Sequence, residues 1–93
     1  MSILGKFKKQ PREVKDFDVS YSDFFTLRSD TPITFTALAD DGVILDRVEL
    51  TGMTGKVVLS GGTSGVSYKV TVTMTTSTGI VKEDEFVVSV KEI

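Results

Sequence analysis

Residues 68–75 read Tyr-Lys-Val-Thr-Val-Thr-Met-Thr, and this stretch decides the fold because apolar and polar side chains alternate along all of it. The apolar positions are Tyr68, Val70, Val72 and Met74. Such strict alternation predicts a β-strand with one buried face and one solvent-facing side. The turn signal Ser77-Thr78-Gly79 follows directly. The sequence therefore predicts a strand whose chain then turns back.

The segment after that turn alternates in the same way, with Phe86, Val88 and Val90 on the inward parity. Together the two segments predict a long antiparallel hairpin whose register is fixed by the alternation. No stretch of the chain predicts a helix of useful length. The last two predicted strands therefore form the centre of an all-β fold.

Working towards the N-terminus, turn signals rich in glycine, proline and aspartate divide the chain into further short strands. The predicted strands are residues 13–19, 33–37, 43–51 and 56–60. Their expected inward residues include Val14, Phe17, Ile33, Phe35 and Ala37. In residues 43–51 the apolar parity changes, so we expect a bulge or a change of sheet near Leu45. Residues 21–27 predict a short helical turn capped by Ser22 that closes one end of the core.

Tyr68 stands three residues after Gly65, at the start of the clearest strand. This placement suits a tyrosine corner, in which the phenol bonds back to the backbone of the preceding loop. With about six or seven short strands, the pattern predicts a small immunoglobulin-like antiparallel β-sandwich. We place that sandwich at residues 13–93 and an extended basic arm at residues 1–12.

The composition excludes much chemistry. Cysteine and tryptophan are absent from the 93 residues, as is histidine. Thiol nucleophiles, disulfides, Cys/His zinc sites and histidine acid–base catalysis are therefore impossible. No apolar run is longer than three residues, so the sequence predicts no membrane-spanning helix. The first residues lack the long apolar stretch of a signal peptide, and we expect synthesis and retention in a cytoplasm.

The charge is distributed unevenly. Residues 1–12 carry Lys6, Lys8, Lys9 and Arg12 without an acid, whereas the whole chain has a net charge of −2. A basic segment on an acidic body favours docking to a negative surface. Four cations would give only weak, salt-sensitive affinity for nucleic acid, so we expect an acidic protein neighbour instead. We predict that the arm is disordered alone and folds on docking. The expected interface residues are Ile3, Leu4, Phe7, Lys8, Lys9 and Arg12.

Carboxylates are the remaining candidates for chemistry. A calcium site at Asp40, Asp41 and Asp46 matches no dedicated calcium loop. In the run 83–85, Glu83 and Glu85 would share one face while Asp84 points to the other, and a domain this small has little room for a catalytic cleft. The glycine-rich loop at residues 61–65 lacks the lysine and helix that phosphate binding requires. We therefore predict no enzymatic activity, no metal and no cofactor.

A family resemblance adds to this interpretation. Residues 59–73 read Leu-Ser-Gly-Gly-Thr-Ser-Gly-Val-Ser-Tyr-Lys-Val-Thr-Val-Thr, and the hairpin signal Thr76-Ser77-Thr78-Gly79 follows. This combination resembles the small bacteriophage tail proteins called phage fiber-tail adaptors. Residues 22–25, Ser-Asp-Phe-Phe, are similar to the aromatic-rich segment of that family, with phenylalanine where tryptophan is common. The resemblance extends from about Glu13 to Ile93.

The resemblance implies a non-enzymatic virion component located in the tail or neck. Such a protein would join tail, portal or connector proteins to fibres, in several copies around a symmetric tail, after synthesis in the host cytoplasm. The expected contacts are the edge strands and end loops, including residues 51–55 and 61–65. Two alternatives stay open at this point: a carbohydrate-binding or host-surface-binding immunoglobulin-like module, and a bacterial surface repeat.

Overall fold

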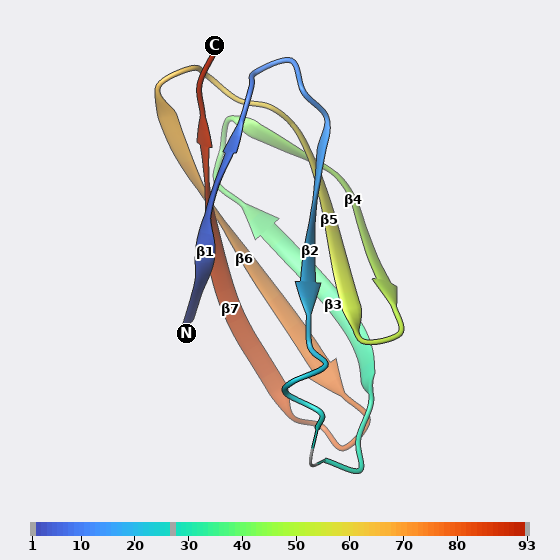
Figure 1. The fold of residues 1–93 in the computed structure, drawn as a ribbon. Helices are drawn as coiled ribbons and strands as arrows, with labels where there is room; N and C mark the ends of the chain where they lie inside the picture. Colours follow the sequence, from blue (N-terminus) through green and yellow to red (C-terminus); the bar gives the residue numbers. More distant parts are fainter. Residues whose placement is uncertain (1, 27, 93) are drawn as a thin grey trace.

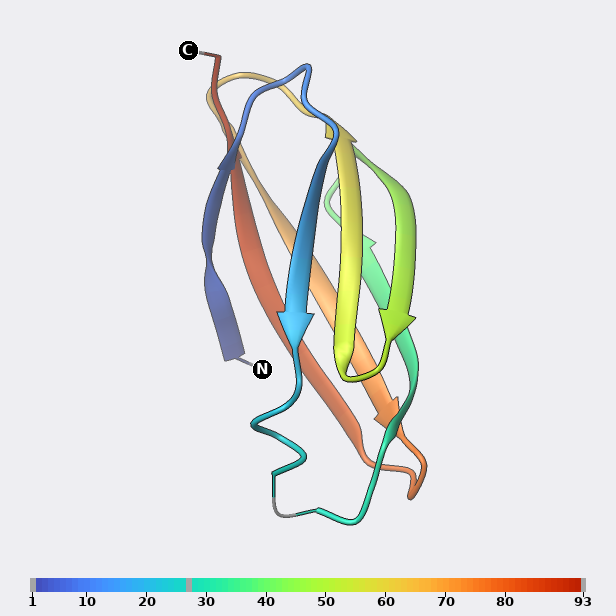
Figure 2. The same cartoon turned by 45° about the vertical axis from the view of Figure 1, so that its right-hand side comes forward.

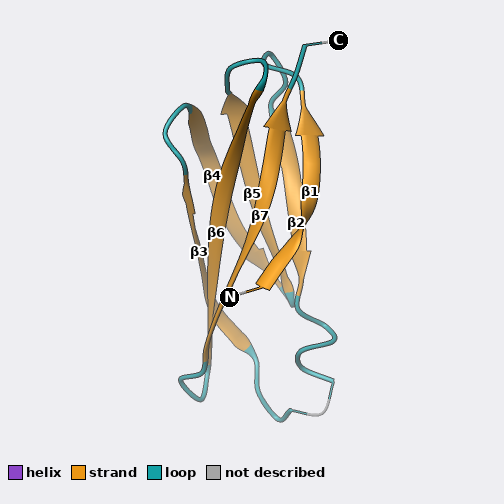
Figure 3. Ribbon diagram, turned by 90° about the vertical axis from the view of Figure 1, so that its left-hand side faces the viewer, coloured by secondary structure: helices purple, strands orange, loops and turns teal. Residues whose placement is uncertain are grey.

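A computed structural model describes residues 2–26 and 28–92, with side chains for the described residues from residue 4 onward. The described residues contain seven strands. The strands are β1 (Ser2–Lys9), β2 (Lys15–Ser20), β3 (Pro32–Ala39), β4 (Val43–Thr51), β5 (Thr54–Gly61), β6 (Val66–Thr76) and β7 (Val81–Val90). They form a four-stranded sheet in the order β1-β7-β6-β3 and a three-stranded sheet in the order β2-β5-β4 (Figure 1). The two sheets pack face to face (Figures 2 and 3). The prediction of an all-β sandwich is confirmed.

The predicted hairpin is β6 and β7, which pair antiparallel from Val66↔Val90 to Thr75↔Val81. All of the residues assigned to its inward parity are buried: Tyr68, Val70, Val72, Met74, Phe86, Val88 and Val90. The change of parity in residues 43–51 is also confirmed as a bulge, because the β4–β5 register shifts between Leu45 and Arg47. That shift lets Val43 and Leu45 face the core together with Val48 and Leu50.

The structure corrects two details. Val14 is 68% exposed because it precedes β2 and lies in the connecting loop. Ile33 is 56% exposed because the β3–β6 register shifts between Pro32 and Thr34, which turns its side chain outward. Residues 22–26 form the predicted turn, in which Phe25 N–H donates to the Tyr21 carbonyl at 3.2 Å. Tyr21 and Phe25 are buried and close that end of the core, as expected.

The N-terminal segment also differs from the prediction. Residues 2–9 are extended, but they belong to the sandwich itself. They form β1, the edge strand of the four-stranded sheet, which pairs parallel with β7. The sandwich is therefore not purely antiparallel. Two inward contacts explain the placement: Phe7 lies edge-on to Phe86 with ring centroids 5.7 Å apart, and Lys9 is 2% exposed.

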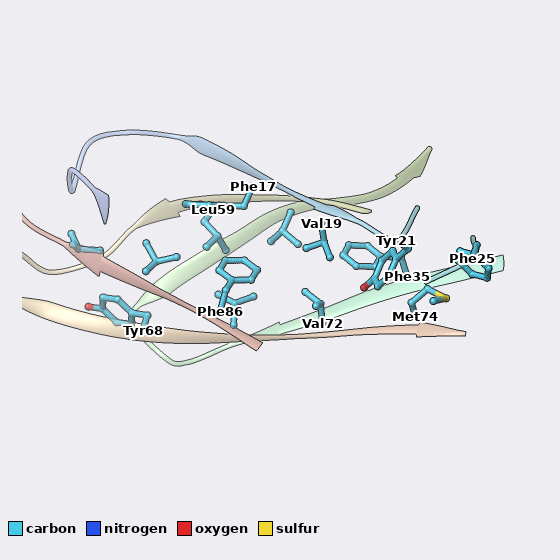
Figure 4. Close-up of a cluster of buried hydrophobic side chains, with 14 residues drawn as sticks. Phe17, Val19, Tyr21, Phe25, Phe35, Leu59, Tyr68, Val72, Met74 and Phe86 are labelled. Atoms are coloured by element: carbon cyan, nitrogen blue, oxygen red, sulfur yellow. The ribbon is translucent and has the colours of Figure 1, made fainter. Parts of the chain in front are cut away.

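The core is one continuous cluster of side chains between the sheets (Figure 4). Phe17 from β2 lies against Phe86 from β7 at 5.4 Å, and Tyr21 lies edge-on to Phe35 from β3 at 6.0 Å. Aromatic pairs at these separations contribute stability beyond their buried area. The inward-facing apolar side chains of both sheets thus hold the fold together.

A buried charge interrupts this core. Asp84 on β7 is 1% exposed, and Lys82 Nζ donates to its Oδ1 at 3.3 Å. The same ammonium lies 3.2 Å from Oδ2, which has no hydrogen bond. A buried carboxylate without a partner is energetically costly. We therefore expect Lys82→Met to lower the free energy of unfolding by about 2 kcal/mol. This loss is smaller than that for a fully buried ion pair because Lys82 is partly exposed.

The double variant Lys82→Met, Asp84→Leu is the matched control for this prediction. Replacing both charges by apolar side chains removes the desolvation cost, so its unfolding free energy should return to the wild-type value or exceed it. Urea unfolding followed by circular dichroism measures both variants. Equal losses in the single and double variants would contradict this account.

The Tyr21 hydroxyl is a second buried polar group without a hydrogen bond. Burial, together with the negative charge of Asp84, raises the pKa of Tyr21 to about 12. The Tyr21 phenol therefore stays neutral up to a higher pH in the folded chain than in the unfolded chain. Below pH 10 the Tyr21 phenol is neutral in both states, and its contribution to the free energy of unfolding is fully present. Between pH 10 and about 12 that contribution is lost, and the free energy of unfolding falls by about 2 kcal/mol in total.

We expect Tyr21→Phe to keep wild-type stability near neutral pH, since the hydroxyl that it removes has no partner. In alkaline solution the variant should lose less stability than the wild type, because phenylalanine does not ionise. Urea titrations of both proteins on each side of pH 10 measure the difference. Lysine deprotonation affects both proteins alike, so parallel curves would argue against this role of Tyr21.

Candidate interaction surfaces

The molecule is elongated, with extents of 45 × 21 × 19 Å, and the strands run along its length (Figure 3). Four surfaces are therefore distinct: two ends made of loops, and two long edges where the outermost strands of the sheets lie side by side. β1 and β2 form one edge, and β3 and β4 form the other (Figure 2). We call them the β1–β2 edge and the β3–β4 edge.

The β1–β2 edge holds a groove of about 220 Å³ between the two sheets, with both apolar and polar lining residues. Its lining residues are Leu4, Phe7, Phe17, Asp18, Val19, Ser20 and Phe86. Phe7 forms one side of the groove and packs against Phe17 at 5.5 Å. At 41% exposure, Phe7 is the most exposed aromatic side chain in the described part of the chain. This edge thus offers an apolar surface to a partner.

Most of the described residues in the predicted interface lie on this edge or beside it. Leu4 is 42% exposed, and Lys8 is exposed. Arg12 is exposed in the loop between β1 and β2. Ile3 belongs to β1, but its side chain lies outside the described residues. The structure therefore brings Leu4, Phe7 and Lys8 together on one strand.

Lys9 is the exception among these residues. Its Nζ donates to the Gly61 carbonyl at 2.6 Å and to the Gln10 carbonyl at 2.8 Å, which ties the end of β1 to the loop after β5. Burial lowers the pKa of Lys9, while the charges of Glu13 and Asp46 oppose that shift. At 2% exposure, this ammonium holds the fold and is not available to a partner. A lysine is typical of a surface position, but Lys9 lies two residues after Phe7 in β1 and therefore shares its inward parity.

The β3–β4 edge combines exposed apolar side chains with acids. Leu38 on β3 is 77% exposed and Ile44 on β4 is 60% exposed. Asp40 and Asp41 lie in the turn between the two strands, and Asp46 lies at the bulge of β4. The one cation on these elements, Arg47, is paired with Glu49 at 2.7 Å. The edge is therefore acidic in balance. No local sequence pattern predicted this edge.

One end of the molecule is built around the loop that contains Gly65. Tyr68 Oη accepts a hydrogen bond from the Thr63 amide at 2.9 Å, and the Gly65 amide donates to the Val90 carbonyl at 2.8 Å. Gly42, at φ +112°, packs beside the same ring, and a Cβ there would lie 2.7 Å from Tyr68 Cε1. These contacts join the loop after β5 to the turn after β3.

The opposite end is joined through Asp30. Its carboxylate accepts hydrogen bonds from Ser77 Oγ at 2.5 Å and from Thr78 Oγ1 at 2.7 Å, so the loop after β2 is bound to the turn after β6. The Ser77 bond above all holds the pKa of Asp30 well below its ordinary value. This end also exposes apolar side chains, with Met53 at 39% and Ile80 at 43%. It is an ordered, partly apolar surface.

The carboxylates considered for chemistry are distributed over different elements. Asp40 accepts a hydrogen bond from the Lys69 amide at 2.8 Å, and Glu85 lies 3.9 Å from Lys69 Nζ. Asp84 is buried on the opposite face of β7 from Glu83 and Glu85. Among the described residues, no group of three or more potential metal-ligating side chains occurs. Within the same residues, no helix has the length and apolar character needed to cross a membrane.

Comparison with known protein families identifies a related family. A family model described as podophage GP4 fiber-tail adaptor protein gp77 matches residues 9–89, which is most of the chain. The match begins at the last residue of β1 and ends within β7, so it covers both sheets. No curated protein matches the chain.

Proposed function

Because the chain belongs to the podophage GP4 fiber-tail adaptor gp77 family, we propose that it acts as a non-enzymatic structural protein that joins tail or neck proteins of a phage particle to its fibres. The family match over residues 9–89 carries this proposal. It confirms the resemblance found in residues 59–73, and it supports a place in the tail region of the virion.

The shape of the molecule supports a role between two larger proteins. Loops gather at both ends of a 45 Å sandwich, so each end presents its own surface to a different neighbour (Figure 1). One end contains the loops 10–14, 40–42 and 62–65, and the other contains residues 21–26 and 28–31 and the loops 52–53 and 77–80. Hydrogen bonds across the loops order both ends before any partner binds, which lowers the entropy cost of association.

Met53 and Ile80 are the candidate contacts at the end that contains residues 77–80. An aspartate at either position would put a charge into an interface that buries apolar surface, whereas the free protein would keep that charge in water. We therefore propose Met53→Asp, Ile80→Asp as a variant that folds normally and fails to connect its neighbours.

The experiment uses phage in which this gene is inactivated and supplied in trans with an epitope tag. Wild-type chain should be found in purified particles, with fibres attached in electron micrographs. The Met53→Asp, Ile80→Asp variant should give particles with fewer fibres. Thr36→Asp, a change at an exposed position on β3 between the two ends, is the matched control for an added charge.

Particles that lack the gene product but carry a full set of fibres would contradict the adaptor role. The carbohydrate-binding alternative is tested with the same purified protein on a glycan array. It would need flat, accessible aromatic rings, and the most exposed ring, Phe7, is already packed against Phe17 and Phe86. Specific glycan retention that is lost in Phe7→Ala would favour the alternative.

A further inference from the structure

The outermost strand β3 presents backbone groups on its open side. It pairs with β6 on one side and lies at the end of the order of the larger sheet. Just beyond the last β3–β6 pair, the Asp40 amide donates to the Lys69 carbonyl at 3.0 Å. Bonded and non-bonded pairs alternate along an antiparallel ladder, so every second residue back from Asp40 bonds to β6. The residues whose N–H and C=O groups point to the open side are thus Phe35, Ala37 and Ala39.

The core is incompletely covered at the same edge. Among the described residues, seven apolar side chains pack against the core and are only partly buried. Six of these seven belong to β3 and β4: Ala37, Ala39, Val43, Leu45, Val48 and Leu50. The two strands lie side by side at one edge of the sandwich (Figure 3). The interior between the sheets therefore opens towards solvent along the β3–β4 edge.

A hollow of about 420 Å³ lies at the start of β3 and the end of β4. Its lining residues are Thr31, Pro32, Leu50, Gly52 and Met53. Pro32 belongs to one sheet and Leu50 to the other, so the hollow lies between the edges of the two sheets. A further strand beside β3 would direct every second side chain into this opening. Those side chains would bury apolar surface on both partners.

The other three outermost strands have features that oppose the addition of a strand. β1 and β2 each have a lysine at an inward position, Lys9 and Lys15. β4 has the bulge after Leu45. Inward charges and bulges are means by which natural proteins prevent pairing with another chain. Residues 34–39 of β3 have neither, since they contain no charge and pair with β6 in unbroken register.

We propose that β3 receives an extended segment of one of the phage proteins that this chain joins, as an additional strand of the larger sheet. Open backbone groups of a strand are satisfied by another strand, so the partner is a polypeptide segment. The segment that fits has apolar side chains at alternate positions facing the opening, and polar ones on the outer face beside Thr34 and Thr36. The source of the segment rests on the proposed adaptor role.

Ala37→Pro tests the backbone contact. It removes an N–H that points to the open side, and proline is tolerated on an outermost strand at such positions. The tagged variant is supplied in trans to phage with this gene inactivated. When the chain is limiting, particles should contain at least about tenfold less of this variant than of wild type, because a hydrogen bond is lost and its partner left unpaired. Ala37→Ser keeps the N–H and is the matched control. Circular dichroism checks that both variants are folded.

Cysteine labelling gives a second measurement that does not depend on proline. The chain has no cysteine, so Ala37→Cys and Thr36→Cys each introduce a single thiol. Ala37 packs against the core, whereas Thr36 lies exposed on the outer face. A maleimide should label Ala37→Cys at least about tenfold more slowly in particles than in the free chain, because the added strand covers it. Thr36→Cys should react alike in both, since an added strand leaves the outer face in water.

Equal labelling of Ala37→Cys in particles and in the free chain would overturn the proposal, as would normal incorporation of a folded Ala37→Pro variant. A maleimide–benzophenone cross-linker on Thr36→Cys then identifies the occupant by mass spectrometry. A product with a tail or fibre protein supports the proposal, and a product with a second copy of this chain alone overturns it. Failure of the adaptor role has a different signature, namely a full set of fibres on particles that lack the gene product.

Discussion

Replacing Phe86 by alanine should lower the free energy of unfolding by about 3–5 kcal/mol, the range found for buried phenylalanine. Phe86 is 1% exposed and lies at the centre of an aromatic trio, 5.4 Å from Phe17 and 5.7 Å from Phe7. The lost ring leaves a cavity between the sheets and removes the surface on which β1 rests. Small domains have about 5–15 kcal/mol of total stability, so the loss is a large fraction of it.

Urea unfolding monitored by circular dichroism measures this effect. The matched control is Phe7→Ala, at the solvent-facing side of the same trio, where 41% of the side chain is already exposed. That variant should lose clearly less stability than Phe86→Ala, because less apolar surface leaves the core. Equal losses at the two positions would show that the trio does not lie as described.

The second large effect is expected from Gly55→Val on β5. A Cβ at residue 55 would lie 2.5 Å from Cε1 and Cζ of Phe35, a distance that real Cβ atoms do not show. The backbone of β5 and the ring of Phe35 thus meet across the two sheets without space for a side chain. Overpacking a well-filled core lowers the free energy of unfolding by about 1–3 kcal/mol. Valine adds two methyl groups to the Cβ that already collides with Phe35, so its effect should reach the upper end of that range.

Phe35→Leu provides the test of the cause. The smaller side chain makes room at residue 55, so the loss from Gly55→Val should be smaller in the Phe35→Leu background than in the wild type. A double-mutant cycle measured by urea unfolding gives this coupling. Additive losses would mean that the two residues do not interact. Gly52→Val is unsuitable as a control because Gly52 has a φ of +58°, which itself disfavours valine.

The sequence predicted the parts of the fold in which a side chain's type and its parity agree. In β6 and β7 the predicted inward residues from Tyr68 to Met74 and from Phe86 to Val90 are all buried, and the alternation alone was sufficient. The bulge at Leu45 was also predictable, because a change of parity within one strand has few physical solutions. Local patterns thus specified the larger sheet's central hairpin and the irregularity in β4.

The misses occurred where type and parity disagree. Lys9 has the inward parity of Phe7 but the type of a surface residue, and three backbone carbonyls within reach of its ammonium satisfy it. Ile33 has the type of a core residue, yet a bulge turns it outward. The partners that decide these cases, Gly61 for Lys9 and β6 for Ile33, are distant in sequence. Only the assembled sheets reveal them.

The same limit applied to the candidate surfaces. The basic residues of the N-terminal segment were visible as a local cluster, and the structure places Leu4, Phe7 and Lys8 on one edge. The β3–β4 edge was missed because it is made of two strands from different sheets, and its exposed apolar residues, Ile33, Leu38 and Ile44, are scattered along them. Its character depends on which strand remains without a partner, and that is a property of the topology.

The parallel pairing of β1 with β7 has a consequence for how the chain reaches its native state. The ribosome makes β1 first, but β7, the only strand with which it pairs, is the last of the seven to be synthesised. During translation the nascent chain therefore carries an unsatisfied strand with an apolar phenylalanine, until the final hairpin is complete. The pairing of β1 with β7 therefore forms late in folding and joins segments that are far apart in the sequence. Such long-range pairing is slow, and it leaves the newly synthesised protein exposed to misassembly.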